Sequence, residues 1–252
     1  MLSILKARWQ QGHRTIGYPD ADPVVPDRLR GLPVIDTEKC PAGCRACIDA
    51  CPTEALRRDA QLQVDLGRCL FCTRCGEACP AGAIRFTNDH RLAVRKREDL
   101  VIGREGIRLA AELDREMMRV FGRSLQFRQV SAGGCNGCEV DVNVLTTVVF
   151  DLSRFGIKIV ASPRHADGLI VTGPVTENMR LATLKTFAGV PAPKLVVAVG
   201  ACAISGGPFR GHPEQHDGVL GLLPVDLFVP GCPPHPLTIL DGLLRLLGRM
   251  KT

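Results

Sequence analysis

Twelve cysteines are the residues of this chain whose type and spacing could do chemistry, and eight of them recur in a regular pattern. The second copy of the pattern reads Cys69-x2-Cys72-x2-Cys75-x3-Cys79-Pro80. In the first copy, the residues that match Cys72, Cys75, Cys79 and Pro80 at one constant offset are Cys44, Cys47, Cys51 and Pro52. This spacing lets one tight loop bind three corners of a 4Fe-4S cluster and sends the fourth thiolate to a neighbouring cluster. The sequence therefore predicts two clusters, each completed from the other half of the repeat.

The pattern is that of bacterial two-cluster ferredoxins and predicts an α+β, ferredoxin-like domain. The crossing of the fourth cysteines divides the thiols into Cys40, Cys44, Cys47 and Cys79 for the first cluster, and Cys51, Cys69, Cys72 and Cys75 for the second. Three residues separate Cys40 from Cys44 where the pattern has two, and Pro41 and Gly43 could form a bulged turn there. Zinc and disulfides are the alternatives, and neither explains two regular runs that end in Cys-Pro.

Four cysteines remain, namely Cys135, Cys138, Cys202 and Cys232. By spacing alone, one Cys-x2-Cys pair and two distant thiols would suit zinc nearly as well as an iron-sulfur cluster. Three of the four positions follow a predicted strand, on a turn that contains glycine. Because ligands gather at the carboxyl ends of strands in an open parallel sheet, we expect these thiols to form one site there. The strand-end glycines let the backbone approach a bulky cofactor such as an iron-sulfur cluster closely, which a single zinc ion would not require.

The elements that must position these thiols follow from hydrophobic patterning. From residue 125 onward, β-rich runs at 125–131, 157–162, 168–175, 194–200 and 226–231 alternate with helical segments at 140–152, 177–187 and 236–250. This alternation predicts an α/β domain with a mainly parallel sheet. Helical spacing also predicts a helix over 104–121.

Four regions result. Residues 1–30 form a docking arm, in which Leu2, Leu5 and Trp9 share a helical face beside basic residues. Residues 31–90 form the two-cluster domain, 91–118 a linker and lead-in helix, and 119–252 the α/β domain. The arm has too little apolar surface to fold alone and is expected to dock on a membrane surface or a partner, with a frayed tail as the alternative.

The α/β domain also carries a resemblance to a known family. FGRSLQFRQVSAGGCNGCEVDVN, SPRHADGLIVTGPVTENM, GACAISGGPF and VPGCPPHP resemble the small subunit of membrane-bound, energy-converting nickel-iron hydrogenases of the formate hydrogenlyase type. That family is homologous to the complex I subunit that carries the terminal cluster nearest quinone. The N-terminal part is similar to the two-cluster ferredoxin subunit of the same complexes, so the chain resembles a fusion of two subunits.

The resemblance implies a flavodoxin-like, complex I B-subunit-like fold and a proximal 4Fe-4S cluster bound by Cys135, Cys138, Cys202 and Cys232. It implies an electron-transfer subunit of an oxidoreductase complex, with three 4Fe-4S clusters and no catalytic residue of its own. The implied partners are a hydrogenase-type or complex-I-type large subunit, membrane-embedded subunits, and an upstream electron-donor subunit or ferredoxin. Complex I homologues have two adjacent cysteines at the first position, so the spacing of Cys135 and Cys138 favours hydrogenase. A complex-I-like NADH or ferredoxin:quinone oxidoreductase without nickel is the alternative.

Other polar residues near the cysteines allow two interpretations. Glu139 and Asp141 begin a predicted helix, where acids are stabilised by the helix dipole; a proton relay is the alternative. His165, His212 and His216 are expected in surface loops rather than at a metal. His235, three residues after Cys232, could tune the third cluster by hydrogen bonding.

Composition limits the partners and the location. The formal net charge is +6, but aromatic residues make up 4% of the chain, too few to stack nucleic-acid bases. The first residues lack the apolar segment of a secretory signal, and the longest apolar stretches are too short to span a bilayer. We expect a cytoplasmic protein that is attached peripherally to the inner face of the cell membrane through partner subunits and binds no nucleic acid.

Overall fold

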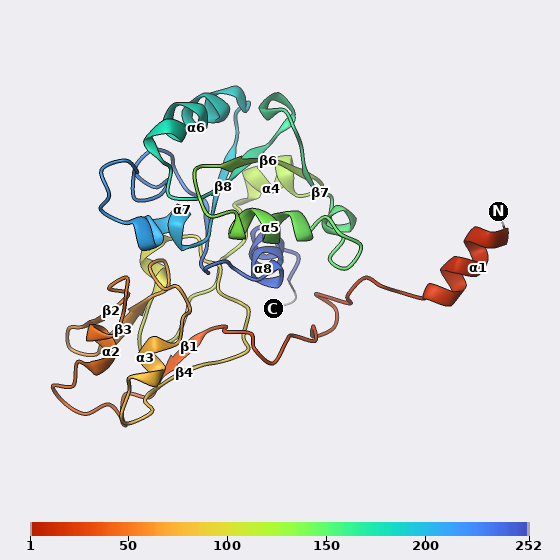
Figure 1. The fold of residues 1–252 in the computed structure, drawn as a ribbon. Coiled ribbons are helices and arrows are strands. Elements are labelled where there is room, and N and C mark those ends of the chain that lie inside the picture. The colour runs from red at the N-terminus through yellow and green to blue at the C-terminus, as the bar shows by residue number, and fades with distance from the viewer. Residues whose placement is uncertain (1, 251–252) are drawn as a thin grey trace.

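The computed structural model describes residues 2–250, which form an N-terminal arm and two modules (Figure 1). The arm begins with helix α1 (Leu2–Gln11), which projects away from the body, and none of whose described residues is buried. None of the described helices is long and apolar enough to cross a membrane.

The first module is built from the repeat. Its two sheets are antiparallel: β1 (Pro33–Ile35) with β4 (Ile84–Phe86), and β2 (Leu56–Arg58), β3 (Leu62–Asp65) and β5 (Val101–Ile102). Short helices α2 (Ala46–Asp49) and α3 (Arg74–Glu77) carry the middle cysteine of each copy. Helix α3 follows α2, and β4 follows β2, at the same offset that relates the cysteines, so the sequence repeat is also a structural one. The predicted α+β class of this module is confirmed.

The second module contains a five-stranded sheet whose pairings are all parallel. Its strands are β6 (Leu125–Ser131), β7 (Ile157–Ile159), β8 (Gly168–Thr172), β9 (Leu195–Val199) and β10 (Leu227–Val229). They lie in the order β10-β9-β8-β6-β7, so the first two strands of this module, β6 and β7, exchange places relative to their order in the sequence. The prediction of an α/β domain with a mainly parallel sheet is confirmed. Every residue of β8 and β9 is buried, as expected of central strands covered on both faces.

Helices cover both faces of this sheet. One face packs on α4 (Arg115–Phe121), α5 (Gly137–Val144) and α8 (Pro236–Leu246). The other face packs on α6 (Glu177–Gly189) and α7 (Ala201–Ser205). Short 3-10 helices complete the fold: η1 (Arg97–Leu100), η2 (Leu152–Phe155), η3 (Pro163–His165) and η4 (Gly207–Phe209).

Three predicted helices were wrong in their limits, and one of them, expected over 236–250, ends at Leu246. The helix expected over 104–121 begins only at Arg115, because Asp114 caps it and the preceding segment instead bonds to other parts of the chain: Ala110 N–H donates to Ala93 O and Leu113 N–H to Leu246 O. The helix expected over 140–152 runs from Gly137 to Val144. It stops before two threonines whose hydroxyls donate to carbonyls of its last turn, in a β-branched stretch that is a poor helix former.

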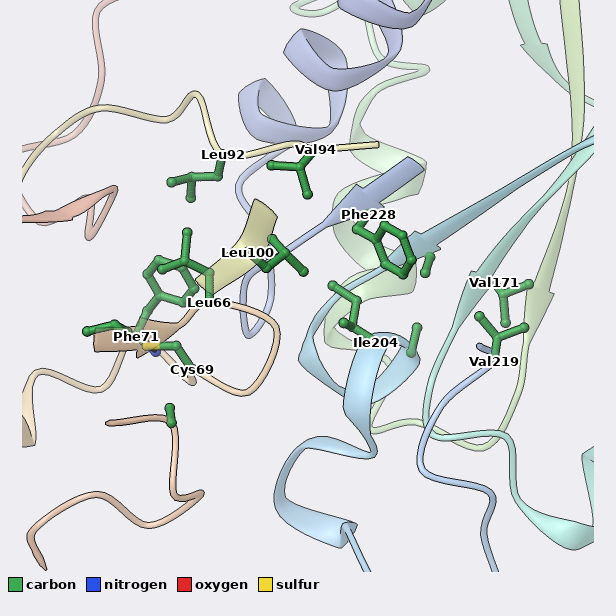
Figure 2. Packing of buried hydrophobic residues seen from close by; sticks show 14 of the residues in the cluster. Leu66, Cys69, Phe71, Leu92, Val94, Leu100, Val171, Ile204, Val219 and Phe228 are labelled. Atoms are coloured by element: carbon green, nitrogen blue, oxygen red, sulfur yellow. Dashed lines mark hydrogen bonds between the residues drawn. The ribbon is translucent and has the colours of Figure 1, made fainter. Parts of the chain in front are cut away.

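The two modules share one hydrophobic core. Leu66 of the first module packs with Leu92 and Leu100 of the segment that follows it, and this cluster continues into Phe228 and Ile204 of the second module (Figure 2). Val94, in the linker, forms an antiparallel bridge with Phe228. Ser205 Oγ donates to Gly67 O at 2.7 Å. The modules are therefore packed against each other as one body, which fixes the distances between their cysteines.

Tyr18 anchors the arm to the second module. Its hydroxyl donates to Asp241 Oδ1 at 2.6 Å, and Arg245 Nε donates to Asp241 Oδ2 at 2.8 Å. Asp241 is fully buried, so these donors compensate a carboxylate that water cannot reach. Burial is the largest cause that raises the pKa of Tyr18, and the charge of Asp241 is the next. The hydroxyl therefore stays protonated and can donate.

Tyr18→Phe is expected to loosen the arm, because Asp241 loses one of its two donors. A buried hydrogen bond to a charged group is worth roughly 1.5–3 kcal/mol, so amide exchange around residues 15–18 should accelerate by about tenfold or more. Hydrogen exchange with mass spectrometry measures this. Thr15→Val, which removes an exposed bond to Val148 O, is the matched control with a small expected effect. Equal exchange in both variants would contradict the anchoring role.

Candidate functional site

The structure brings the first predicted set of thiols together. Cys47 lies in α2 and is buried, while the other three are half-buried on the surrounding loops. Burial raises the pKa of Cys47, and the charges of Cys40, Cys79 and Cys44 raise it further. Gly43 adopts φ +76°, the left-handed conformation expected for the bulged turn between Cys40 and Cys44.

The second predicted set also comes together. Burial raises the pKa of Cys69 to about 12 and that of Cys75 to about 11. In both cases a backbone N–H partly offsets this rise, and the charges of Cys51 and Cys72 add to it. Cys51 therefore lies with the thiols of the other half of the repeat, as the crossing pattern predicts.

The third set gathers at the carboxyl edge of the parallel sheet. Cys135 and Cys138 follow β6, Cys202 follows β9 in the first turn of α7, and Cys232 follows β10. Burial raises the pKa of Cys138 above its usual range and that of Cys202 to about 12. The charges of Cys232 and Cys135 raise both further, so all four thiols share one site. Cys135 and Cys232 are exposed, and the set therefore opens to the protein surface.

The three sets lie in a row. Helices α2 and α3, which carry Cys47 of the first set and Cys75 of the second, contact each other. Cys232 of the third set lines a cavity together with Leu70 and Phe71, which directly precede Cys72 of the second set. The second set therefore lies between the other two, next to the junction of the modules.

Backbone hydrogen bonds to sulfur repeat with the sequence. Ala55 N–H donates to Cys51 Sγ at 3.3 Å, and Ala83 N–H, at the corresponding place in the second half, donates to Cys79 Sγ at 3.3 Å. Phe71 N–H donates to Cys69 Sγ at 3.3 Å. Such donors are what thiolates bound to an iron-sulfur cluster accept, and they raise the reduction potential of a cluster.

The donor sets fit 4Fe-4S clusters. Burial raises the pKa of at least one thiol in each set, namely Cys47, Cys69 and Cys138 among others. Four grouped thiolates need a positively charged group before they can stay ionised together, and iron supplies that charge. Among residues 2–250, no three His, Cys, Asp or Glu side chains are arranged to hold a single metal ion. Gly200 and Gly207 lie against the third set, where an added Cβ would be 2.4 Å from Cys138 Sγ and 2.8 Å from Cys202 Sγ.

Gly200→Ala is expected to damage the third set. The residue has φ +91°, and the new methyl group would overlap Cys138 Sγ, so the thiol must move. Iron per chain should fall by up to about four atoms, the content of one 4Fe-4S cluster. Gly211→Ala is the matched control, because Gly211 has φ +78° but nothing within 4 Å of its added Cβ. An equal loss of iron in both variants would show that backbone strain, rather than the contact with sulfur, decides the outcome, and full iron content in Gly200→Ala would contradict the prediction.

Glu139 is more than a surface acid at a helix start. It lies in the first turn of α5 and is only 5% exposed. Its Oε1 accepts hydrogen bonds of 2.7 Å from Ser131 Oγ and from Thr172 Oγ1. Its charge is one of the causes that raise the pKa values of Cys138 and Cys202, so a buried negative group faces the third set.

The four histidines considered from the sequence have separate surroundings. His165 is exposed in η3, and His212 Nδ1 accepts from Glu214 N–H. His216 Nε2 lies 2.6 Å from Glu177 Oε2. His235 Nδ1 accepts from Leu237 N–H and so caps α8. This bond occupies the nitrogen that faces the helix, and no hydrogen bond joins His235 to a cysteine among the described residues.

A cavity of about 420 Å³ lies between the arm, the loop of Phe71 and the loop that carries Cys232. Asp141 and His235 line it. Burial raises the pKa of Asp141 and lowers that of His235, so both side chains are biased toward their uncharged forms. The permanent charges that line this cavity beside the second and third sets are thus those of Arg28 and Arg30 of the arm.

Comparison with known families divides the chain in the same way. Residues 32–93 match the family described as 4Fe-4S dicluster domain. Residues 135–246 match the family described as NADH ubiquinone oxidoreductase, 20 Kd subunit.

Three relatives are similar to about half of the chain. Formate hydrogenlyase subunit 7 of Escherichia coli is 40% identical over 141 residues, 56% of this chain and 55% of the relative. Probable membrane-bound hydrogenase subunit mbhJ of Pyrococcus furiosus is 43% identical over 136 residues, 54% of this chain and 81% of the relative. The B subunit of NADH-quinone oxidoreductase from Bacteroides thetaiotaomicron is 40% identical over 115 residues, 45% of this chain and 58% of the relative. The chain thus spans little more than half the length of the first and third of these relatives.

Proposed function

Since the chain belongs to the family of the NADH ubiquinone oxidoreductase 20 Kd subunit and joins it to a 4Fe-4S dicluster domain, we propose that it is the electron-transfer subunit of a membrane-associated nickel-iron hydrogenase of the formate hydrogenlyase type. It is an iron-sulfur subunit of an oxidoreductase complex. To this assignment the proposal adds three clusters on this chain, a nickel-iron centre in the same complex and the identity of the neighbouring subunits. The strand order of the second module supports a flavodoxin-like arrangement, in which sites form at the carboxyl edge.

The twelve cysteines would hold three 4Fe-4S clusters, each of which takes up and releases one electron. The ligands would be Cys40, Cys44, Cys47 and Cys79 for the first, Cys51, Cys69, Cys72 and Cys75 for the second, and Cys135, Cys138, Cys202 and Cys232 for the third. The thiols of each set meet in one place, and all twelve are free of disulfides.

The single observation that carries the proposal is the row formed by the three sets. The contact of α2 with α3 links the first set to the second, and the cavity lined by Phe71 and Cys232 links the second to the third. A row of one-electron sites leading to a surface is the arrangement that a relay requires. The shared core of the two modules holds these sites at fixed separations.

The exposed end of the row would be the docking face for a catalytic large subunit. Cys135 and Cys232 are exposed, and Val140 beside them on α5 is 50% exposed. The arm offers a second attachment, because Leu2, Leu5 and Trp9 of α1 are all more than half exposed beside Lys6 and Arg8. An apolar face with basic neighbours suits an anionic membrane surface or membrane-embedded partner subunits, at the cytoplasmic side. An electron-donor subunit or ferredoxin would approach the first set.

A complex-I-like NADH or ferredoxin:quinone oxidoreductase without nickel is the second candidate, favoured by the similarity to the B subunit of NADH-quinone oxidoreductase. The spacing of Cys135 and Cys138 supports the hydrogenase, because the resemblance assigns two adjacent cysteines to complex I homologues at that position.

Metal analysis of the complex purified anaerobically through this chain tests the proposal. At least about twelve iron atoms per chain are expected for three 4Fe-4S clusters, with nickel close to stoichiometric. Iron without nickel, in a complex that retains its large subunit, would favour the quinone oxidoreductase. Fewer iron atoms would reject three clusters, and zinc in place of iron would reject the relay.

A further inference from the structure

The two halves of the repeat differ in the donor to one cysteine. The crossing cysteines Cys51 and Cys79 accept equivalent backbone bonds, from Ala55 and Ala83. Cys69, the first cysteine of its run, accepts from the N–H of Phe71, two residues later. Cys40 holds the corresponding place in the first run, but within the described chain no backbone N–H donates to its sulfur. The extra residue between Cys40 and Cys44 accompanies this loss of the amide donor.

Arg58 supplies the missing donor. Its Nη2 donates to Cys40 Sγ at 2.8 Å, from the last residue of β2. The half-buried guanidinium makes no ion pair with an Asp or Glu among residues 2–250, and its buried Nε–H has no hydrogen-bond partner there. A positive charge that is partly withdrawn from water is therefore directed at one thiol instead of at a carboxylate.

The repeat itself provides a comparison. The residue that corresponds to Arg58 in the second half is Phe86, the last residue of β4. Phe86 packs edge-on against Phe71 with ring centroids 6.1 Å apart, and it lies beside the second set of thiols. Equivalent positions in the two halves thus bring a cation to the first set and an apolar ring to the second.

We propose that Arg58 is a positioning residue that balances the charge of the Cys40 thiolate and raises the reduction potential of the first cluster relative to the second. This inference rests on the proposed function. One-electron reduction adds one negative charge to a cluster and its thiolates, and a nearby cation stabilises the reduced form more than the oxidised form. A charge-assisted hydrogen bond to sulfur acts in the same direction and is about twice as strong as a neutral one.

Arg58→Gln tests this inference in the full chain, reconstituted or purified anaerobically with its complex. Each cluster is titrated with dithionite and followed by electron paramagnetic resonance. One of the three midpoint potentials is expected to fall, with about a tenfold smaller equilibrium constant for reduction, or about 59 mV for a one-electron couple. Arg58→Lys keeps the charge without the planar fork and should give a smaller fall. Arg57→Gln is the matched control with no expected shift, because Arg57 lies on the same strand but pairs with Gln63 and Asp59.

Three unchanged midpoint potentials in Arg58→Gln, with full iron content, would overturn the inference. If Arg58→Gln loses the iron of one cluster, Arg58→Met, which keeps an apolar stem without the charge, decides in its place, and three unchanged potentials there overturn the inference equally. Failure of the proposed function has a different signature, because the unsubstituted chain would then lack three titrating signals.

Discussion

Replacement of Cys202 by serine is expected to remove about four of about twelve iron atoms per chain and one complete spectroscopic signal. Cys202 is buried at the start of α7, and its thiol shares a site with those of Cys135, Cys138 and Cys232. A hydroxyl is a far poorer iron ligand, and the buried position leaves no room for another residue to replace it. Electron delivery through the exposed end of the row should fall to background, while the two signals of the first module remain.

Two variants make this result specific. Phe209→Ser changes a half-exposed side chain close to the same helix and should keep all iron. Cys44→Ser should also lose about four iron atoms, but a different signal. Retention of three signals in Cys202→Ser would contradict the third site, and loss of all three would contradict the separation of the modules into independent cluster sites.

Cys79→Ser is expected to have an effect of similar size and tests the crossing. Cys79 belongs to the second run in sequence, but its charge acts on Cys47 of the first set. We therefore expect Cys79→Ser to lose the same signal as Cys44→Ser, and to retain the signal that Cys72→Ser loses. Iron analysis and electron paramagnetic resonance of the three variants measure this directly.

The opposite pairing, in which Cys79→Ser and Cys72→Ser lose one signal in common, would reject the crossing. Loss of about eight iron atoms from each variant would contradict the separate action of the two sets. Thr73→Ala serves as the control within the second run, because Thr73 donates to the exposed Glu77 and to its neighbour's carbonyl rather than to sulfur.

The sequence was sufficient to predict the five strands of the parallel sheet, and it led to the proposed grouping of the cysteines. Five β-rich runs separated by helical segments predict a parallel sheet, because helices then connect consecutive strands. The cysteines that follow three of these runs are expected at the carboxyl edge of that sheet. The repeat predicted the two other groups, because cluster ligation by Cys-x2-Cys-x2-Cys depends on local spacing. Helix limits were less predictable, since the segment before Arg115 is held by Ala93 and Leu246, which are distant in sequence.

Partners of individual side chains were also beyond the sequence. Arg58 stands between Arg57 and Asp59 and has the local pattern of an exposed charge, although it reaches the distant thiol of Cys40. The donors to Glu139 come from two strands that pair in register, Ser131 with Thr172. Hydroxyl residues at the ends of β6 and β8 were the only signal for this arrangement, and it has meaning only once the strand order is known.

The crossing of the ligands also has a consequence for biosynthesis. A chain leaves the ribosome from its N-terminus, so Cys40, Cys44, Cys47 and Cys51 emerge before any thiol of the second run. Four thiols are then available together, yet the proposed crossing assigns them to two different sites. Metal bound at that stage would recruit Cys51 in place of Cys79 and leave both sites wrong. Cluster delivery to this protein should therefore follow the emergence of residue 79, and factors that keep the nascent thiols free of metal until then would raise the yield of correctly loaded chain.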